Sequence, residues 1–204
     1  MSTNNRQHAT RAISAFSRDF GRVERAILLK GHTNDMSNLS IMIQLLEYRR
    51  FSSHSSCEWR SVLRELLKAI RGLSFGGAST IDMQLVRTIT GKMKLTIGRN
   101  INEIVLATAI RRRHTPEAII GAYMRLAYFG ENMFGAEQAS FIIFGCSASD
   151  FSLNQAAKLA SMLVAPYPKM HTTLWAERIN TRSNYATAIY DRSLELAWFK
   201  RLAL

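Results

Sequence analysis

Proline is scarce in this chain, and that scarcity constrains the fold more than any other feature. Residues 41–165 contain a single proline, Pro116. Long helices are therefore permitted, because a proline inside a helix removes a hydrogen-bond donor and clashes with the preceding turn. Apolar residues recur at helical spacing, for example at Val62, Leu66 and Ile70, whereas strand-like alternation is weak. The pattern predicts an all-α, mainly helical fold built as one domain.

Local signals predict where several helices begin and end. A helix is expected over residues 37–50, with a serine cap at its start, and another begins at Pro116, a residue type suited to the first helical position. The apolar run over residues 153–164 predicts a third helix. Residues 12–29 are expected to form one amphipathic helix, and glycines flank a predicted loop over residues 130–135.

The charge balance indicates which partners the chain attracts. Lys and Arg number 27 against 15 Asp and Glu, which gives a formal net charge of +12. Nucleic acid, anionic lipid head groups and phosphate-bearing substrates would all be attracted. The basic run over residues 111–114 lacks the interleaved aromatic side chains of a single-strand binder, so cations at a helix end are the preferred interpretation there. No nucleic-acid partner is expected.

Cysteine usage and hydropathy argue against several further classes of protein. Two cysteines, Cys57 and Cys146, do not make a disulfide framework, although a single bridge stays open. No Cys/His cluster has the spacing of a zinc site. The chain has no apolar run of about 18 residues and no continuous apolar core near its start, so neither a transmembrane helix nor a secretory signal is expected within it.

Glu47 is the first candidate for chemistry. It follows an apolar run near the expected end of a helix, where a carboxylate can be half-buried. Partial removal from water would make it a usable general base. The alternative is a solvated glutamate paired with Arg49 or Arg50, and the local pattern by itself favours that alternative.

The segment over residues 77–87 is the second candidate. Small residues lead into a helix with Ser79 and Thr80 near its start, and the free backbone N–H groups of a first turn suit a phosphate or pyrophosphate. Gln84 and Arg87 lie one helical turn apart and could face the same ligand. The alternative is a capped helix after a glycine turn, and the pattern does not choose between them.

Arg99 and Glu103 are the third candidate. They are four residues apart and therefore share one face of a helix. Taken alone, the spacing favours a surface ion pair that contributes only about 0.3–0.5 kcal/mol.

Five stretches, the first three of which contain these candidates, follow one another along the chain. They are EYRRFSSH (residues 47–54), GASTIDMQLVRT (77–88), RNINE (99–103), IIGAYMR (119–125) and FGAEQA (134–139). In this order they resemble the motifs of the peptidoglycan glycosyltransferase (transglycosylase) domain, glycosyltransferase family 51. That domain occurs in monofunctional transglycosylases and bifunctional penicillin-binding proteins, and the resemblance covers roughly residues 37–190.

The resemblance implies a lysozyme-like helical domain over residues 37–204, preceded by a helical extension over residues 1–36. It implies that Glu47 is the general base and that Glu103 is the second catalytic carboxylate, in the donor site. The positions matched to substrate binding are Ser79, Thr80, Gln84, Arg87 and Arg99.

The same resemblance implies the reaction and its setting. Lipid II and a lipid-linked glycan would be the substrates, joined with inversion and with release of polyprenyl pyrophosphate. We expect a membrane-associated protein at the outer (periplasmic) face, in contact with the membrane surface. No cofactor is required by the pattern, although a divalent metal, Mg²⁺ or Mn²⁺, could accompany the pyrophosphate.

Two alternatives to that activity stay open. Several family motif residues are replaced, among them an Asp by Tyr48, a Lys by Asn100 and a Glu by Gly121. A degenerate domain that binds precursor or glycan without catalysis would fit these replacements. A lysozyme-like glycan hydrolase would also use two carboxylates.

Overall fold

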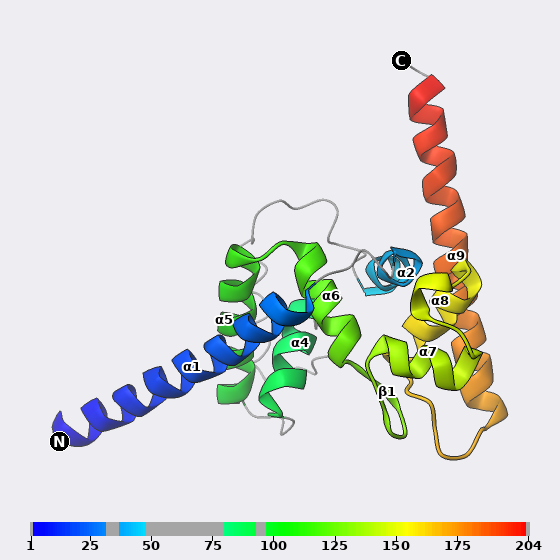
Figure 1. Ribbon diagram of the computed structural model, residues 1–204. Coiled ribbons are helices and arrows are strands. Elements are labelled where there is room, and N and C mark those ends of the chain that lie inside the picture. Colours follow the sequence, from blue (N-terminus) through cyan, green and yellow to red (C-terminus); the bar gives the residue numbers. More distant parts are fainter. Residues whose placement is uncertain (1, 32–36, 48–79, 93–96, 203–204) are drawn as a thin grey trace. The chain divides into compact units, whose positions relative to one another are not determined.

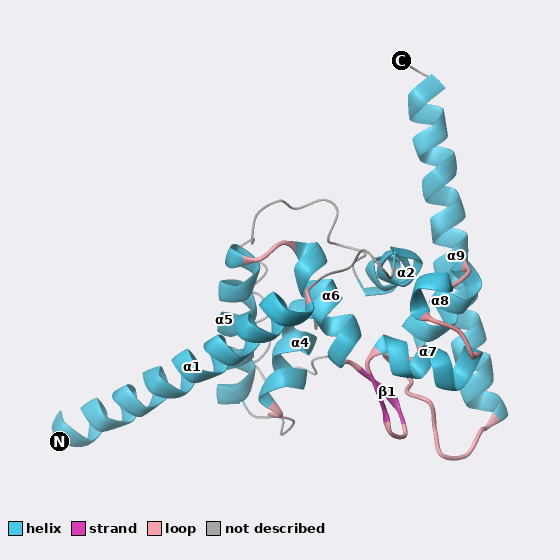
Figure 2. Ribbon diagram, viewed as in Figure 1, coloured by secondary structure: helices cyan, strands magenta, loops and turns pink. Residues whose placement is uncertain are grey.

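The computed structural model describes residues 2–31, 37–47, 80–92 and 97–202 (Figure 1). Its contacts group into two compact units. Unit 1 comprises residues 1–32 and 54–123, and unit 2 comprises residues 33–53 and 124–204. Helices make up most of the described chain (Figure 2), so the predicted all-α class is confirmed.

Unit 1 is built from helices that pack around one apolar core. Helix α1 packs against α4 and α5, which also pack against each other. The core residues include Val23 and Ile27 of α1 with Leu85 of α4 and Leu106 of α5, all of them buried. The helices are α1 (Ser2–Lys30), α4 (Ile81–Thr90), α5 (Ile97–Arg113) and the first part of α6 (Pro116–Leu126).

Helix α4 has a defined cap at each end. The hydroxyl of Thr80 accepts a hydrogen bond from the backbone N–H of Met83 at 3.4 Å, which satisfies one of the free donors of the first turn. Gly91 ends the helix in the left-handed region at φ +67°, and its N–H donates to the carbonyl of Arg87 at 3.0 Å. The capped helix and the functional interpretation of this segment are therefore compatible.

Unit 2 centres on α8, which packs against both α2 and α9. Ser152 and Gln155 form a capping box that starts α8. The elements are α2 (Ser37–Glu47), the last part of α6, β1 (Tyr128–Gly130), β2 (Met133–Phe134), α7 (Ala136–Phe144), η1 (Ala148–Asp150), α8 (Leu153–Ser161) and α9 (Thr173–Leu202). Helix α9 is the red and orange helix that leads to the C-terminus in Figure 1.

Most predicted helix starts are confirmed, and the ends differ. A helix begins at Pro116, and the helix expected over residues 12–29 is part of the longer α1. The helix predicted over residues 37–50 is observed over 37–47, and the last three positions lie outside the described residues. The helix predicted over residues 153–164 ends three residues early, at Ser161. The boundary predicted between residues 36 and 37 stays a prediction.

The loop predicted over residues 130–135 contains the turn of a short antiparallel hairpin, formed by β1 and β2. Gly130 pairs with Tyr167 from a distant part of the chain, and its φ is +144°. A Cβ at Gly130 would lie 2.5 Å from the Tyr167 carbonyl oxygen, so only glycine permits this approach. Alternation over so few residues gives no strand signal in the sequence.

Within the described residues, no helix combines the length and apolar character needed to span a bilayer.

Candidate functional site

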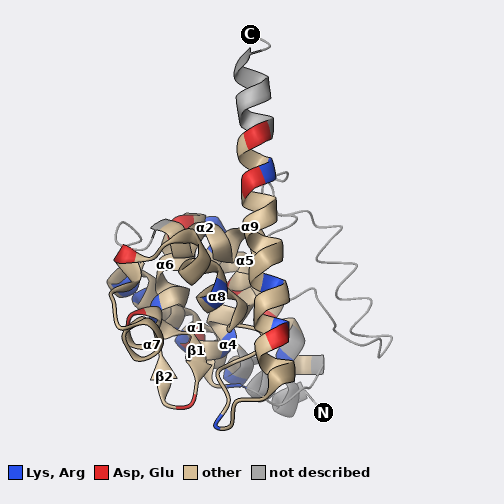
Figure 3. Cartoon of the chain, turned by 90° about the vertical axis from the view of Figure 1, so that its right-hand side faces the viewer, with Lys and Arg blue, Asp and Glu red and all other residues tan. Residues whose placement is uncertain are grey.

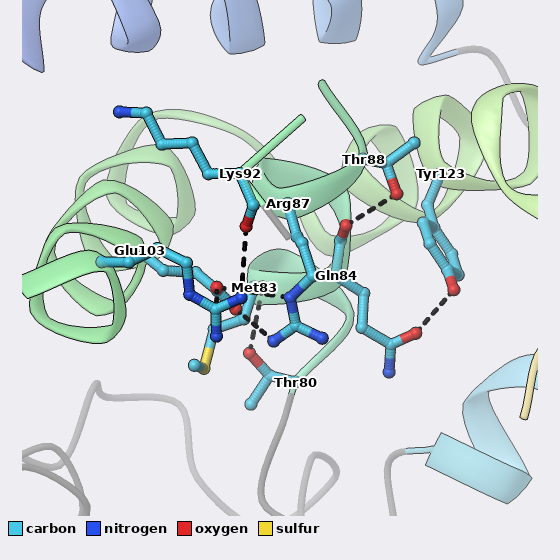
Figure 4. A network of polar contacts seen from close by, with 9 residues as sticks. Thr80, Met83, Gln84, Arg87, Thr88, Lys92, Glu103 and Tyr123 are labelled. Carbon is cyan, nitrogen blue, oxygen red and sulfur yellow. Dashed lines mark hydrogen bonds and ion pairs between the residues drawn. The ribbon is translucent and has the colours of Figure 1, made fainter. Parts of the chain in front are cut away.

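The best-defined polar cluster of unit 1 is centred on Glu103 of α5, which is 3% exposed. Arg87 of α4 binds it with two donors: Nη2 lies 2.6 Å from Oε1, and Nε lies 3.3 Å from Oε2. This two-point contact between a guanidinium and a carboxylate is both strong and directional (Figure 4). It joins α4 to α5 and fixes the position of both side chains.

Arg99 contacts the same carboxylate from one turn earlier on α5. Its Nη2 lies 3.7 Å from Oε2 of Glu103, and its Nη1 donates to the carbonyl of Lys92 at 3.1 Å. Only 8% of the Arg99 side chain is exposed. The interpretation as a surface ion pair is therefore wrong, because the packing of α4 against α5 removes both groups from water.

The structure thus brings together three of the predicted site residues, Arg87, Arg99 and Glu103. Among these three side chains, two guanidinium groups share one carboxylate. An anion placed beside the guanidinium groups would be attracted more strongly than in bulk water, because the surroundings are poorly solvated.

A groove of about 390 Å³ lies beside Arg99 of this cluster. Phe16 of α1, Lys92 and Arg99 are among its lining residues. Lys92 is held by the buried carboxylate of Asp19, with Nζ 2.5 Å from Oδ2. No sequence pattern indicated a contribution of α1 to this region, because Asp19 and Lys92 are 73 residues apart.

Gln84 and Thr80 occupy the same helix as Arg87, but their contacts differ. The hydroxyl of Tyr123 donates to Oε1 of Gln84 at 2.5 Å, whereas Thr80 caps the helix start. In Figure 4 Gln84 points toward Tyr123 and Arg87 points toward Glu103. Tyr123 was not among the predicted site residues, although it lies in the fourth matched stretch. Ser79, the remaining predicted binding residue, lies outside the described residues.

Asp82 is a further buried carboxylate on α4. Both of its oxygens accept from Nη1 of Arg111, at 3.2 and 3.3 Å. Burial raises the pKa of Asp82 above its ordinary value, and the charge and hydrogen bond of Arg111 oppose that rise. The sequence suggested only that Arg111 complements a helix end. In the structure Arg111 also balances a carboxylate 29 residues away.

Glu47, the predicted general base, lies at the end of α2 in unit 2. Its side chain is 10% exposed, and its Oε1 lies 2.5 Å from Nη2 of Arg182 on α9. Glu47 is therefore more deeply buried than the predicted half-burial. The alternative partners Arg49 and Arg50 lie outside the described residues. No sequence signal pointed to Arg182, which is 135 residues away in the chain.

The residues around Glu103 do not form a metal site by themselves. Both carboxylate oxygens are contacted by arginines, which repel a cation. Across the described ranges, no group of three or more His, Cys, Asp or Glu converges as metal ligands. The suggested Mg²⁺ or Mn²⁺ stays a prediction.

Comparison with known proteins now decides the family. Residues 22–189 match the family model described as Transglycosylase. The chain belongs to the transglycosylase family. The resemblance inferred from the five motif-like stretches is confirmed, and the match includes both candidate carboxylates.

Individual relatives carry names from the same family. Penicillin-binding protein 2a of Streptococcus pneumoniae is 34% identical over 134 residues, which are 66% of this chain and 18% of that protein. Penicillin-binding protein 1B of Haemophilus influenzae is 34% identical over 127 residues, which are 60% of this chain and 16% of that protein. A biosynthetic peptidoglycan transglycosylase of Herminiimonas arsenicoxydans is 31% identical over 138 residues, which are 67% of this chain and 59% of that protein. The chain therefore spans less than a fifth of each of these penicillin-binding proteins.

For this transglycosylase-family chain, the comparisons also bear on the N-terminal helix. The family match begins at Arg22, inside α1, so the second part of that helix belongs to the matched region. This agrees with the packing of α1 against α4 and α5 in unit 1.

Proposed function

We propose that this transglycosylase-family domain is a peptidoglycan glycosyltransferase that polymerises lipid II into glycan strands. The observation that carries the proposal is the cluster in which Arg87 and Arg99 both contact the buried carboxylate of Glu103. A leaving group that departs as a pyrophosphate requires positive charge beside it. The family membership supplies the reaction class, and the names of the relatives support peptidoglycan as the product.

Glu47 is proposed as the general base. The 4-hydroxyl oxygen of the acceptor attacks the anomeric carbon of the donor, and its proton passes to the Glu47 carboxylate. The bond from that carbon to the pyrophosphate oxygen breaks, and the bonding electrons leave with the polyprenyl pyrophosphate. Attack opposite the leaving group inverts the anomeric centre. Arg182 would orient the Glu47 carboxylate through the contact already described.

Arg87 and Arg99 are proposed to bind the pyrophosphate, and Glu103 to hold both guanidinium groups in place. Glu103 therefore acts as the second carboxylate by organising the donor site. Thr80 and Gln84 belong to the same helix, and Tyr123 fixes the Gln84 side chain. By family resemblance, the lipid-linked substrates place the reaction at the outer face of the membrane.

The test is polymerisation of labelled lipid II by the parent, by Glu47→Gln and by Glu177→Gln, which changes an exposed carboxylate on α9. A general base typically contributes 10²–10⁴-fold to the rate. We expect a loss of about that size for Glu47→Gln and an unchanged rate for Glu177→Gln, with both variants folded by circular dichroism. Equal polymerisation by Glu47→Gln and the parent would reject Glu47 as the base.

A degenerate binding domain is the second candidate, because Gly121 lies on buried α6 where the family motif has a glutamate. Binding of a lipid II analogue by a folded parent that forms no polymer would select this candidate. Release of soluble fragments from purified sacculus would select a hydrolase instead.

A further inference from the structure

The outer face of α1 carries positive charge that no acidic residue of the same helix balances. The only acids of α1 are Asp19 and Glu24. Both form ion pairs with other helices or loops: Asp19 pairs with Lys92, and Glu24 pairs with Arg113 at 3.3 Å. The arginines elsewhere on the helix are thus left without a carboxylate from their own helix.

These arginines form a stripe along one side of the helix. Arg11, Arg18, Arg22 and Arg25 are exposed and recur at spacings of seven, four and three residues, which places them on one face. The opposite face, with Val23 and Ile27, is buried in unit 1. In Figure 1 the N-terminal part of α1 also extends beyond α4 and α5.

Exposed apolar side chains lie at the C-terminal end of the same helix. Leu28 is 66% exposed and Leu29 is 71% exposed. Leucine side chains this exposed cost free energy in water, because each could bury an apolar surface worth about 1.5–3 kcal/mol in full. A partner that binds cations and also buries leucine side chains would contact the whole exposed face of α1.

A shallow groove joins the two features. It has a volume of about 520 Å³, and it lies between α1 and Ile89 of α4. Its basic lining residues are Arg18, Arg22, Arg25 and Lys30, and its apolar lining residues are Ala26, Leu29 and Ile89. Arg22 donates to the carbonyl of Ile89 at 2.8 Å, which ties the groove to α4. Gly21 leaves it open, since a Cβ there would meet no atom within 4 Å.

We propose that α1 is a docking element that lies along the surface of an anionic lipid bilayer. Phosphate head groups would bind the arginine stripe and the groove, and Leu28 and Leu29 would enter the acyl boundary. A helix with one basic face and adjoining apolar residues binds such interfaces through both contributions. The proposal goes beyond the glycosyl transfer, because it concerns a surface that takes no part in the proposed chemistry.

Charge complementarity favours this occupant over two others. A second copy of the chain would bring a like-charged stripe against this one, which is electrostatically unfavourable. A nucleic acid would pair with the arginines but would leave Leu28 and Leu29 exposed. An anionic bilayer accepts both kinds of side chain.

The first experiment is cosedimentation of the full chain with two kinds of vesicle, phosphatidylcholine alone and phosphatidylcholine with phosphatidylglycerol. We expect binding only to the anionic vesicles, and weaker binding as salt is raised. Each basic residue near an anionic surface contributes about fivefold, so Arg18→Gln/Arg25→Gln should weaken binding about 25-fold. Leu28→Ser/Leu29→Ser should weaken it at least tenfold.

Helix α9 offers matched controls, because it carries charges of both signs (Figure 3). Arg178→Gln/Arg192→Gln removes two exposed arginines, and Leu174→Ser/Leu194→Ser removes two exposed leucines. Both control variants should bind anionic vesicles within twofold of the parent. An equal loss in these controls would show that net charge or general apolarity is responsible, which would overturn the docking role of α1.

Three further results would overturn the proposal. They are equal binding of the parent to neutral and anionic vesicles, retention of binding by both α1 variants, and binding of a DNA duplex in place of vesicles. Polymerisation of detergent-dispersed lipid II is measured separately on the same variants and should be unchanged. Vesicle binding without polymerisation would therefore reject the proposed function alone, and polymerisation without α1-dependent vesicle binding would reject this inference alone.

Discussion

The two units each bury a catalytic candidate, and they neutralise it in different ways. In unit 1 Glu103 is shared by Arg87 and Arg99, which come from two helices. In unit 2 Glu47 pairs with Arg182 of α9. Arg182 is 29% exposed, close to the 31% of Arg87, whereas Arg99 is only 8% exposed.

The difference in neutralisation suggests a difference in function. A carboxylate held by two cations is a good organiser of positive charge. By exchanging its contact with the partly exposed Arg182, Glu47 would become available to a substrate hydroxyl. The pairing therefore agrees with assigning the proton transfer to Glu47 and the leaving-group site to the cluster around Glu103.

The largest effect is expected for Glu103→Gln. Removing one member of a buried ion pair typically costs about 3–5 kcal/mol, because the remaining charge is left buried. We expect the free energy of unfolding to fall by about 3 kcal/mol for Glu103→Gln and by at most about 1 kcal/mol for Glu47→Gln, since Arg182 can be hydrated. Urea unfolding at neutral pH measures both. Equal losses in the two variants would break the distinction between the sites.

A smaller effect is expected for Arg182→Gln. Without Arg182, the Glu47 carboxylate would be less well oriented, and polymerisation should fall about tenfold, which corresponds to about 1.4 kcal/mol in the barrier. Arg182→Lys should recover part of that rate, because it keeps the charge but loses the planar fork of the guanidinium. A rate assay with lipid II measures both variants. Full activity of Arg182→Gln would separate Arg182 from the function of Glu47.

Tyr123→Phe tests the hydrogen bond that links α6 to the donor-site helix. Its removal leaves Oε1 of Gln84 without the phenolic donor, and a typical hydrogen bond contributes about 1 kcal/mol. We expect kcat/KM to fall about fivefold, with a loss of about 1 kcal/mol in urea unfolding. If only the unfolding free energy changed, Tyr123 would have a structural role alone.

The smallest effect is expected for Asp82→Asn, and it depends on pH. Burial raises the pKa of Asp82 above 3.8, against the opposing charge of Arg111. The native state therefore holds the proton more tightly than the unfolded state does. The stability contributed by Asp82 is complete below pH 3.8 and is lost as the pH rises through the raised native pKa. Hence the free energy of unfolding of the parent, relative to Asp82→Asn, should fall between pH 3 and pH 7. Urea unfolding across this range measures the difference, and a rise with pH would contradict the assignment.

Local chemistry made much of the fold predictable. The proline at position 116, the threonine cap at Thr80 and the apolar spacing in the helices depend on residues only a few positions apart. Sequence patterns report such short-range preferences directly. The hairpin formed by β1 and β2 was missed because it depends on a close approach between Gly130 and Tyr167.

The members of the candidate site were proposed from the sequence, whereas their pairing could not be. The order of the motif-like stretches identified Glu47, Arg87, Arg99 and Glu103, which all fall within the family match. The sequence spacing suggested that Arg99 and Glu103 form a surface pair, and packing of α4 on α5 buried both instead. The contact of Tyr123 with Gln84 spans 39 residues and could not be read from spacing.

The sequence by itself thus determined the family, the helical class and the identity of the charged residues, because each is encoded in composition or in short motifs. Only the tertiary structure decided which arginine balances which carboxylate, and which face of α1 is left exposed and basic. Those outcomes depend on helices that are distant in the chain and share one core, where burial removes water and makes each charge depend on its neighbours.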